Sequence, residues 1–353
     1  MGAKYGATTS LRSCCVVLGD QDGWGTNRLS KAESILGTGI SQNLSRGRRH
    51  ACPVVIRKRI TLDGDGKVTV NGGSNLTIEA DGEVVRGLHL SHSGDSHDQV
   101  DAGILIKAND TVVQDNIIDD SLFGIHLSSS HGNQVIGNRM TNSRISMELV
   151  FSPENEICGN TFNDNYNGIT VIYSDELTIA DNHILRMRKL TGSGISVKES
   201  YDILIDNNEI AHCAVGLLAT SPLEAENILT ITNNLFTFND VAAYFYGEKG
   251  GHQIYDNRFI DNFVDAMGST THTSRLNNWK GNYWDSYSGF DLNHDGVGDQ
   301  PHRVYLYADS IWMERFYRGT PALTLIDFVE RLIPSSEPDL MYADPAPLMT
   351  PKH

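Results

Sequence analysis

The fold is decided by the stretch Asn116-Ile117-Ile118, in which an asparagine is followed by one variable residue and then by an apolar one. The pattern occurs eight times, and consecutive asparagines are separated by 22, 22, 22, 26, 26, 23 and 25 residues. The eight asparagines are Asn116, Asn138, Asn160, Asn182, Asn208, Asn234, Asn257 and Asn282. Such regular self-similarity indicates a solenoid, because one unit alone cannot bury its apolar face.

The short apolar runs between the asparagines indicate the type of solenoid. Each run alternates apolar and polar residues, is rich in β-branched side chains and is bounded by Gly, Asn or Asp, which is typical of a strand. Leucine-rich repeats need a Leu-x-x-Leu-x-Leu frame that this sequence lacks, and helical repeats need a longer period. We therefore predict an all-β fold, a right-handed parallel β-helix of the pectin-lyase type with coils of 22–26 residues.

The eight asparagines are predicted to form a structural ladder. Stacked coils lie about 4.8 Å apart, so equivalent asparagines lie above one another at a turn, where their amides bond to the backbone and to each other. Loss of one rung should cost about 1–3 kcal/mol, because buried polar partners lose their hydrogen bonds. The two spacings of 26 residues contain insertions near 188–191 and 221–224, which we expect to project as loops.

The pattern divides the chain into three parts. Residues 1–52 lack alternation and are interpreted as a poorly patterned leader or as the product of a mis-assigned start. Residues 53–278 carry the repeats, beginning with strands at 54–56 and 59–62 and a turn at 63–66. Residues 279–353 are predicted to form a C-terminal cap with an Asp-rich loop and a helical docking tail.

Composition limits the classes of partner. The chain has 353 residues, a formal net charge of −16 and a pI near 5.1, which argues against binding to nucleic acid. No apolar run approaches the roughly 18 residues that span a membrane. The five cysteines include no Cys-x-x-Cys pair, and Cys158 and Cys213 occupy different positions in their coils, so we expect no disulfide between them.

A polar loop between residues 91 and 101 is one candidate metal site. It carries His92, Asp95, His97, Asp98 and Asp101. Imidazole and carboxylate groups at this spacing are able to bind a transition metal. A solvated loop without a metal explains the same composition and is the alternative.

A second candidate metal site follows the last coil. Residues 291–299 match the first nine positions of a calcium loop, with a glycine at the sixth position. The predicted ligands are Asp291, Asn293, Asp295, Val297 (through its backbone carbonyl) and Asp299. The twelfth position holds His302 in place of a bidentate glutamate, so a loop rich in Asx turns and without an ion is the alternative.

The rest of the C-terminal part is predicted to close the solenoid and to carry a docking helix. Five aromatic residues should seal the open end of the core: Trp279, Tyr283, Trp284, Tyr287 and Phe290. Farther along, Thr320 caps a predicted helix that ends at Pro334. Its candidate docking residues are Pro321, Leu323, Ile326, Val329 and Ile333. This helix packs on the β-helix as a cap or docks on a partner protein.

Parallel β-helices include glycan-degrading enzymes, but the sequence contains no catalytic motif that we recognise. The adjacent pair Asp119-Asp120 lies in a predicted turn, where acids are common for conformational reasons. The Asn-Thr-Asp, Gly-His-Gly and Arg-Ile-Lys signatures of polygalacturonases and the Asp-Pro-His-Asp segment of alginate epimerases are absent. His126 alternates with two apolar neighbours, so it is expected to face outward and to be exposed. We predict no catalytic residue.

The C-terminal block resembles a known family. Gly281-Asn282-Tyr283-Trp284, the stretch from Gly289 to Asp299, the helix that begins at Thr320 and the tail from Asp344 to Met349 are similar to the end of NosD proteins. Shorter similarities lie near the front, at Gly87-Leu88, at 101–104 and at 122–125. The resemblance covers about residues 53–349.

The resemblance implies a non-catalytic role in the periplasm. NosD proteins work with an ABC transporter, made of the NosF ATPase and the NosY membrane subunit, and with the copper chaperone NosL. Together they assemble the copper centres of nitrous oxide reductase. The resemblance therefore implies these four partners, with copper as a transient ligand bound directly or through partners, but no motif assigns copper-binding residues. A carbohydrate-binding or carbohydrate-active β-helix protein is the alternative, and a structural β-helix stabilised by calcium is a third hypothesis.

Overall fold

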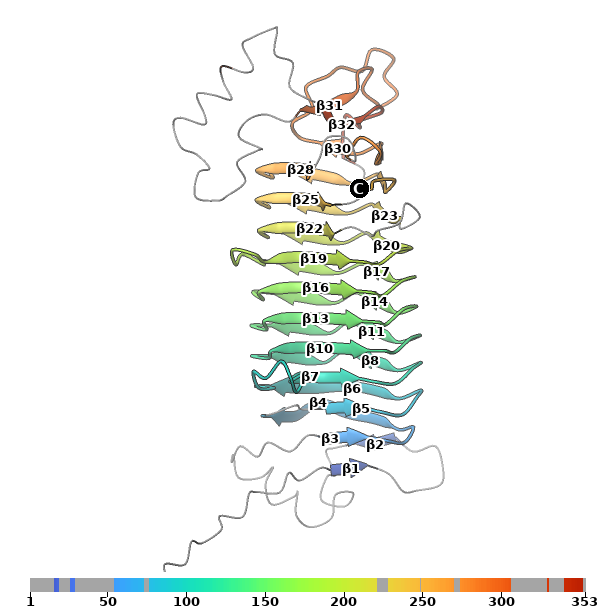
Figure 1. The fold of residues 1–353 in the computed structure, drawn as a ribbon, viewed down its shortest axis with the longest axis vertical. Helices are drawn as coiled ribbons and strands as arrows, with labels where there is room; N and C mark the ends of the chain where they lie inside the picture. Colours follow the sequence, from blue (N-terminus) through green and yellow to red (C-terminus); the bar gives the residue numbers. More distant parts are fainter. Residues whose placement is uncertain are drawn as a thin grey trace, which may run out of the picture.

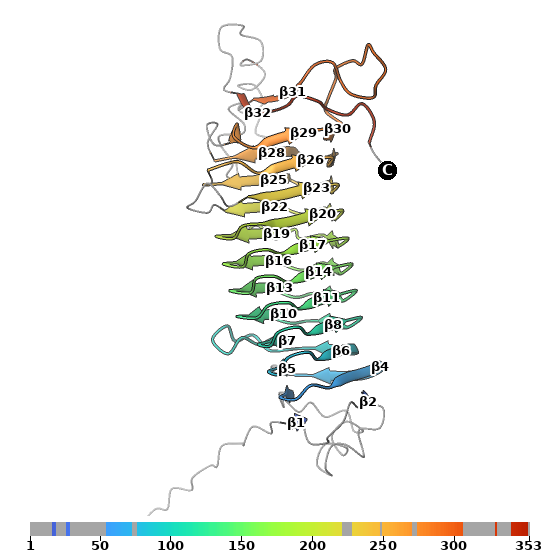
Figure 2. The same cartoon turned by 90° about the vertical axis from the view of Figure 1, so that its right-hand side faces the viewer.

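The computed structural model is a parallel β-helix that winds through about nine turns (Figure 1). It describes residues 16–18, 26–28, 54–72, 76–220, 228–247, 249–269, 274–305, 329 and 340–351. The coils stack along the long axis of the molecule, and a 90° rotation shows the last strands, β31 (His302–Tyr305) and β32 (Leu340–Asp344), beyond the final coil (Figure 2). The described residues contain no helix long and apolar enough to cross a membrane.

Three ladders of parallel strands form the walls of the solenoid, because each coil from β7 to β30 contributes one strand to each ladder. The first ladder contains β1 (Val16–Leu18), β3 (Val54–Ile56), β5 (Leu76–Ile78), β7 (Ala102–Ile106), β10 (Phe123–Ser128), β13 (Ile145–Val150), β16 (Asn167–Ile172), β19 (Ser193–Lys198), β22 (Val215–Thr220), β25 (Val241–Tyr246) and β28 (Val264–Gly268).

The second ladder contains β2 (Thr26–Arg28), β4 (Thr61–Asn71), β6 (Val84–Ser91), β8 (Val112–Gln114), β11 (Gln134–Ile136), β14 (Glu156–Cys158), β17 (Thr178–Ala180), β20 (Ile203–Asp206), β23 (Leu229–Thr232), β26 (Gln253–Tyr255) and β29 (Asn278–Lys280). The third contains β9 (Ile117–Asp119), β12 (Arg139–Thr141), β15 (Thr161–Asn163), β18 (His183–Leu185), β21 (Glu209–Ala211), β24 (Leu235–Thr237), β27 (Arg258–Ile260) and β30 (Tyr283–Trp284). The long strand β6 pairs with both β8 and β9, so it turns the corner between these two ladders.

One continuous apolar core runs along the axis between the three ladders. Alternate residues of each strand point inward, and equivalent residues of successive coils lie in register, as Met140 does with Phe162. Toward the C-terminal end the inward column becomes aromatic, with Phe236 stacked on Phe259 and Phe259 on Trp284. The coils approach so closely that a Cβ atom at Gly124 would lie 2.3 Å from the carbonyl oxygen of Ser146, which explains the small residue of the repeat.

The eight asparagines form an unbroken hydrogen-bonded column at the corner between the second and third ladders. In the middle of the column, Asn182 accepts bonds at its Oδ1 from the backbone N–H (2.9 Å) and the Nδ2 (3.1 Å) of Asn160. Its own Nδ2 donates to Ile157 O (2.9 Å) and to Asn208 Oδ1 (2.9 Å). None of the eight side chains is more than 1% exposed, so each satisfies polar groups that water does not reach.

One local prediction is wrong. Residues 63–66, predicted as a turn that ends a strand, lie inside β4 as an irregularity with positive φ at Asp65 and Gly66, where the register with β6 shifts. Strands β1 and β2 lie in the predicted leader and pair with β3 and β4. The described part of the cap contains the antiparallel hairpin β31–β32, whereas the predicted helix between Thr320 and Pro334 lies outside the described residues except for Val329.

The cap closes the core with fewer of the five predicted aromatics than expected. Trp279 and Trp284 are buried and lie against Tyr342 of the cap, with ring centroids 4.4 and 5.7 Å away. Phe290, in contrast, is 47% exposed, because it lies in the loop that leaves the solenoid. Residues 188–191 do form a projecting loop in which Leu190 is 60% exposed, whereas 221–224 lie outside the described residues.

Candidate functional site

The predicted metal-binding loop does not converge on one point. His97 packs edge-on against the ring of Phe123, 5.6 Å away. Asp101 is almost completely buried and accepts a hydrogen bond from the backbone N–H of Ser96. These two residues therefore help to fold the loop, and the five polar residues are not brought together as the loop hypothesis required.

His92 joins a different group on the neighbouring coil. The pairing of β6 with β9 places Ser91 beside Asp119, so the next residues of the two coils, His92 and Asp120, lie side by side. Among the residues that the structure describes, His92, Asp119 and Asp120 are the one set of three His, Cys, Asp or Glu whose ligand atoms all lie within 4.8 Å of one another. His89 completes the cluster, since its Nε2 lies 2.6 Å from Asp119 Oδ2.

The cluster keeps Asp119 in its charged form. Partial burial would raise the pKa of Asp119, but the hydrogen bonds from Ser91 and His89 and the charges of His89 and His92 lower it below its usual value. Ser91 also bonds to His92 Nδ1 at 2.5 Å. This geometry leaves His92 Nε2 directed toward Asp120, 3.8 Å away.

His126 is buried, which corrects the expectation that it is exposed. Its side chain does face away from the core, but Phe123 covers it at a centroid distance of 5.2 Å. A small second apolar cluster of Ala102, Leu105, Leu122 and Phe123 lies there, outside the first ladder. His126 Nδ1 is 3.0 Å from Glu148 Oε2 without the alignment of a hydrogen bond.

The Asp-rich loop uses its oxygen atoms to hold its own backbone. Asp291 accepts hydrogen bonds from the N–H groups of Asp295 and Gly296, and Asp295 accepts one from Val297. Asp299 accepts one from the N–H of Leu292. Within the described residues the carboxylates of Asp291, Asp295 and Asp299 do not form a group of three with ligand atoms within 4.8 Å. This is the pattern of Asx turns, and calcium binding stays a prediction.

The last rung of the asparagine column is bound by an aspartate from the C-terminal tail. Asp344 Oδ2 accepts hydrogen bonds from the backbone N–H and Nδ2 of Asn282 and from Trp284 Nε1, at 2.9, 2.9 and 3.2 Å. Its Oδ1 accepts one from the N–H of Gly281 at 3.1 Å. Asp344 therefore occupies the place of a ninth asparagine, a role that the sequence pattern did not reveal.

His302, the twelfth position of the predicted calcium loop, belongs to the core of the cap. Its ring stacks on Trp284 with centroids 4.8 Å apart. Burial lowers the pKa of His302 to about 4, although Asp344 and Asp285 oppose the shift. A neutral, buried imidazole here does not supply the bidentate carboxylate that the twelfth position of an EF-hand provides.

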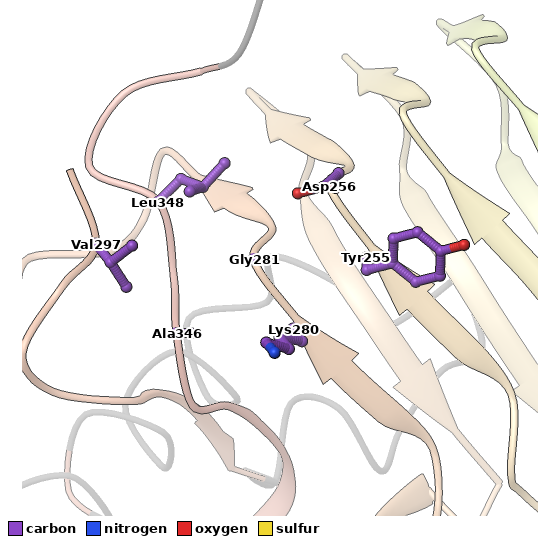
Figure 3. Close-up of a pocket in the computed structure, with 7 residues that line it drawn as sticks. All are labelled: Tyr255, Asp256, Lys280, Gly281, Val297, Ala346 and Leu348. Atoms are coloured by element: carbon purple, nitrogen blue, oxygen red, sulfur yellow. The ribbon is translucent and has the colours of Figure 1, made fainter. Parts of the chain in front are cut away.

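The C-terminal tail also lines a shallow pocket of about 350 Å³ (Figure 3). Its lining combines a turn of the last coils with the tail: Tyr255, Asp256, Lys280, Gly281, Val297, Ala346 and Leu348. It holds one carboxylate and one ammonium group and neither His nor Cys. Of the predicted docking residues, Val329 is helical and 42% exposed, whereas Pro321, Leu323, Ile326 and Ile333 lie outside the described residues.

Comparison with known proteins identifies relatives and fold neighbours. Residues 60–289 match the family described as "Periplasmic copper-binding protein (NosD)". A probable ABC transporter binding protein NosD from Stutzerimonas stutzeri is 26% identical over 110 residues, which are 30% of this chain and 25% of that protein. The chain thus matches about a quarter of the length of that relative.

Solved structures resemble this chain at the level of the fold. A mutant of the periplasmic alginate epimerase AlgG superposes with a TM-score of 0.53 and 13% identity, over 80% of this chain and 75% of that one. At this identity the likeness shows the parallel β-helix and nothing about the reaction or the ligand.

Proposed function

Because the chain belongs to the NosD family, we propose that it is a periplasmic, non-catalytic maturation factor for the copper centre of nitrous oxide reductase. The match over residues 60–289, which cover most of the repeat domain and the start of the cap, is the observation that carries the proposal. The proposed partners are an ABC transporter of the NosF and NosY type, a NosL-like copper chaperone and the reductase.

The architecture suits a protein that positions partners. A solenoid with one continuous core is stiff, and each coil adds surface in a fixed register. The net charge of −16 favours partners with basic surfaces or bound cations. We propose that the coils present one partner surface and that the tail, with the predicted docking residues around Leu323 and Ile326, presents another.

The test is the copper content and visible spectrum of nitrous oxide reductase purified from a strain that lacks this gene. We expect reductase without its catalytic copper cluster, restored by the wild-type gene. Truncation before the tail is a poor second arm, because it would remove Asp344 from the end of the asparagine column. A full-length variant with Leu323→Ser and Ile326→Ser tests the docking helix instead.

In that second arm we expect the double variant to accumulate normally and to leave the reductase without copper. Fully metallated, active reductase from the deletion strain would overturn the proposed function. Screening the purified chain against acidic glycans, for binding and for cleavage, would then test the carbohydrate hypothesis.

A further inference from the structure

The His92 cluster occupies a corner position that the solenoid repeats on eight successive coils. A residue with positive φ directly follows β6 and each third-ladder strand from β9 to β27, and we call these residues the outer corner column. The column contains His92, Asp120, Asn142, Asp164, Arg186, His212, Phe238 and Asp261. The backbone is thus nearly the same at every rung, so differences between rungs come from the side chains.

Other rungs of this column pair their charged or aromatic groups with each other. Arg186 binds Asp164 through two hydrogen bonds of 2.8 and 3.1 Å. His212 stacks on Phe238 with centroids 5.0 Å apart. At the first rungs, by contrast, an imidazole lies over two adjacent carboxylates, Asp119 and Asp120, and no cation of the described chain neutralises both.

We propose that His92, Asp119 and Asp120 bind a divalent metal ion, with His92 Nε2 and one oxygen of each carboxylate as ligands. Three ligands that bind one ion at about 2.1 Å, in a trigonal or tetrahedral arrangement, lie about 3.4–3.6 Å from each other. The three ligand atoms here are within 4.8 Å of one another, so an ion requires them to approach by at most about 1.4 Å. The side chains of His92 and Asp120 are 52% and 48% exposed, which leaves them free to close.

Neighbouring groups orient two of the three ligands. Ser91 holds Nδ1 of His92 and therefore presents the opposite ring nitrogen to the ion. His89 bonds to Oδ2 of Asp119, and Ser91 also bonds to this carboxylate, so both residues hold the carboxylate in position. His89 is thus a positioning residue in the sense that it acts through Asp119.

The ligand set indicates the class of ion. One imidazole with two carboxylates suits Cu(II), Ni(II) or Zn(II), and it lacks the thiolate or thioether that selects Cu(I). Among these ions Cu(II) binds such N and O ligands most tightly. Three protein ligands on a half-exposed corner leave coordination positions open, which suits exchange with a partner. The choice of copper as the physiological ion rests on the proposed function.

The test is titration of the purified full chain with Cu(II), followed by calorimetry and electron paramagnetic resonance. We expect one tight Cu(II) site, with nitrogen from one imidazole in its spectrum. An excess of Zn(II) should displace the bound Cu(II), whereas Ca(II) and Mg(II) should not. In the variants His92→Ala and Asp120→Asn the affinity should fall at least about tenfold, and the nitrogen signal should disappear in His92→Ala. Both residues are exposed, so the melting temperature without metal should not change.

Two matched variants make the assignment specific. His183→Ala removes an exposed histidine of the third ladder whose Nδ1 lies 2.8 Å from Glu209 Oε2 on the next coil. Asp291→Asn changes the Asp-rich loop. Both should bind Cu(II) like the wild type. The proposal is overturned if His92→Ala binds as tightly as the wild type, or if either control loses the site as well.

The site and the proposed function fail in different ways. If the purified chain binds Cu(II) at His92 and the deletion strain still makes fully metallated reductase, the site stands and the maturation role fails. If the deletion strain makes reductase without copper but the purified chain does not bind Cu(II) at this corner, the role stands and the site fails.

Discussion

The asparagine column and the outer corner column repeat with the same period but differ in what they tolerate. The inner column keeps one residue type on eight coils, because each amide bonds to the coil before it and the coil after it inside a dry corner. The outer column holds histidine, aspartate, asparagine, arginine and phenylalanine on the same backbone. The solenoid therefore restricts the residue type where water is excluded and leaves it free where the chain meets solvent.

The largest expected effect comes from breaking the inner column in its middle. Asn182→Ala removes an acceptor for Asn160 and a donor for Ile157 and Asn208. Because four buried partner groups lose a hydrogen bond, the free energy of unfolding should fall by about 3–5 kcal/mol, more than the roughly 1–3 kcal/mol expected from the sequence for one rung. Urea denaturation measures it. The matched control in the outer column is Asn142→Gly, which keeps the positive φ of 54° and should leave the midpoint unchanged. Equal losses in the two variants would contradict the comparison.

The end of the inner column should respond less than its middle. Asp344→Ala leaves the polar hydrogens of Asn282 and Trp284 without their acceptor, and we expect a loss of about 2–4 kcal/mol. Asp344→Asn keeps one acceptor oxygen and should recover part of it. Thermal denaturation of the three proteins gives the order. A melting temperature of Asp344→Ala equal to that of the wild type would show that the tail does not close the column.

The buried carboxyl of Glu83 makes the stability of the fold depend on pH. Burial is the largest influence on Glu83 and raises its pKa from 4.5 to about 7. The folded state therefore favours the protonated form, so this contribution to stability is present below pH 4.5 and is lost as the pH rises through about 7.

The change Glu83→Gln tests this dependence. The neutral amide should match the wild type near pH 4.5 and should be more stable at pH 8, by up to about 3 kcal/mol. Urea denaturation across this range measures the difference. Parallel pH profiles for the two proteins would mean that Glu83 is charged in the folded state. Both proteins share every other titrating group, so the comparison isolates this carboxyl.

The repeats and the asparagine column were predictable because a regular period of 22–26 residues is visible in one sequence, and the coil geometry follows from it. The end of the column was not, since Asp344 lies 62 residues after Asn282 and breaks the spacing. A second interior column was visible but not recognised. Asn165, Asn239 and Asn262 each follow an asparagine of the first column by five residues, and Cys213 takes that place on its coil.

The candidate metal site shows a different limit. In the sequence, His92 and the pair Asp119-Asp120 belong to separate turns that begin 27 residues apart. Their meeting depends on the register between β6 and β9, and β6 is longer than the repeat predicts because it turns a corner. His89 lies on that strand at an outward position, and alternation along β6 was the signal that could have identified it.

The smallest effect is expected for an ion pair on the outer corner column. Arg186 and Asp164 form an ion pair on the outer corner column with hydrogen bonds of 2.8 and 3.1 Å. The side chains of Arg186 and Asp164 are about half exposed, so water and salt screen the attraction, and Arg186→Ala should leave the urea midpoint within error of the wild type. Any small difference at low ionic strength should vanish at about 0.5 M salt, where the Debye length is less than about 5 Å. A loss as large as that of Asn182→Ala would mean that the outer column also holds the coils together, and the freedom of its residues would then need another explanation.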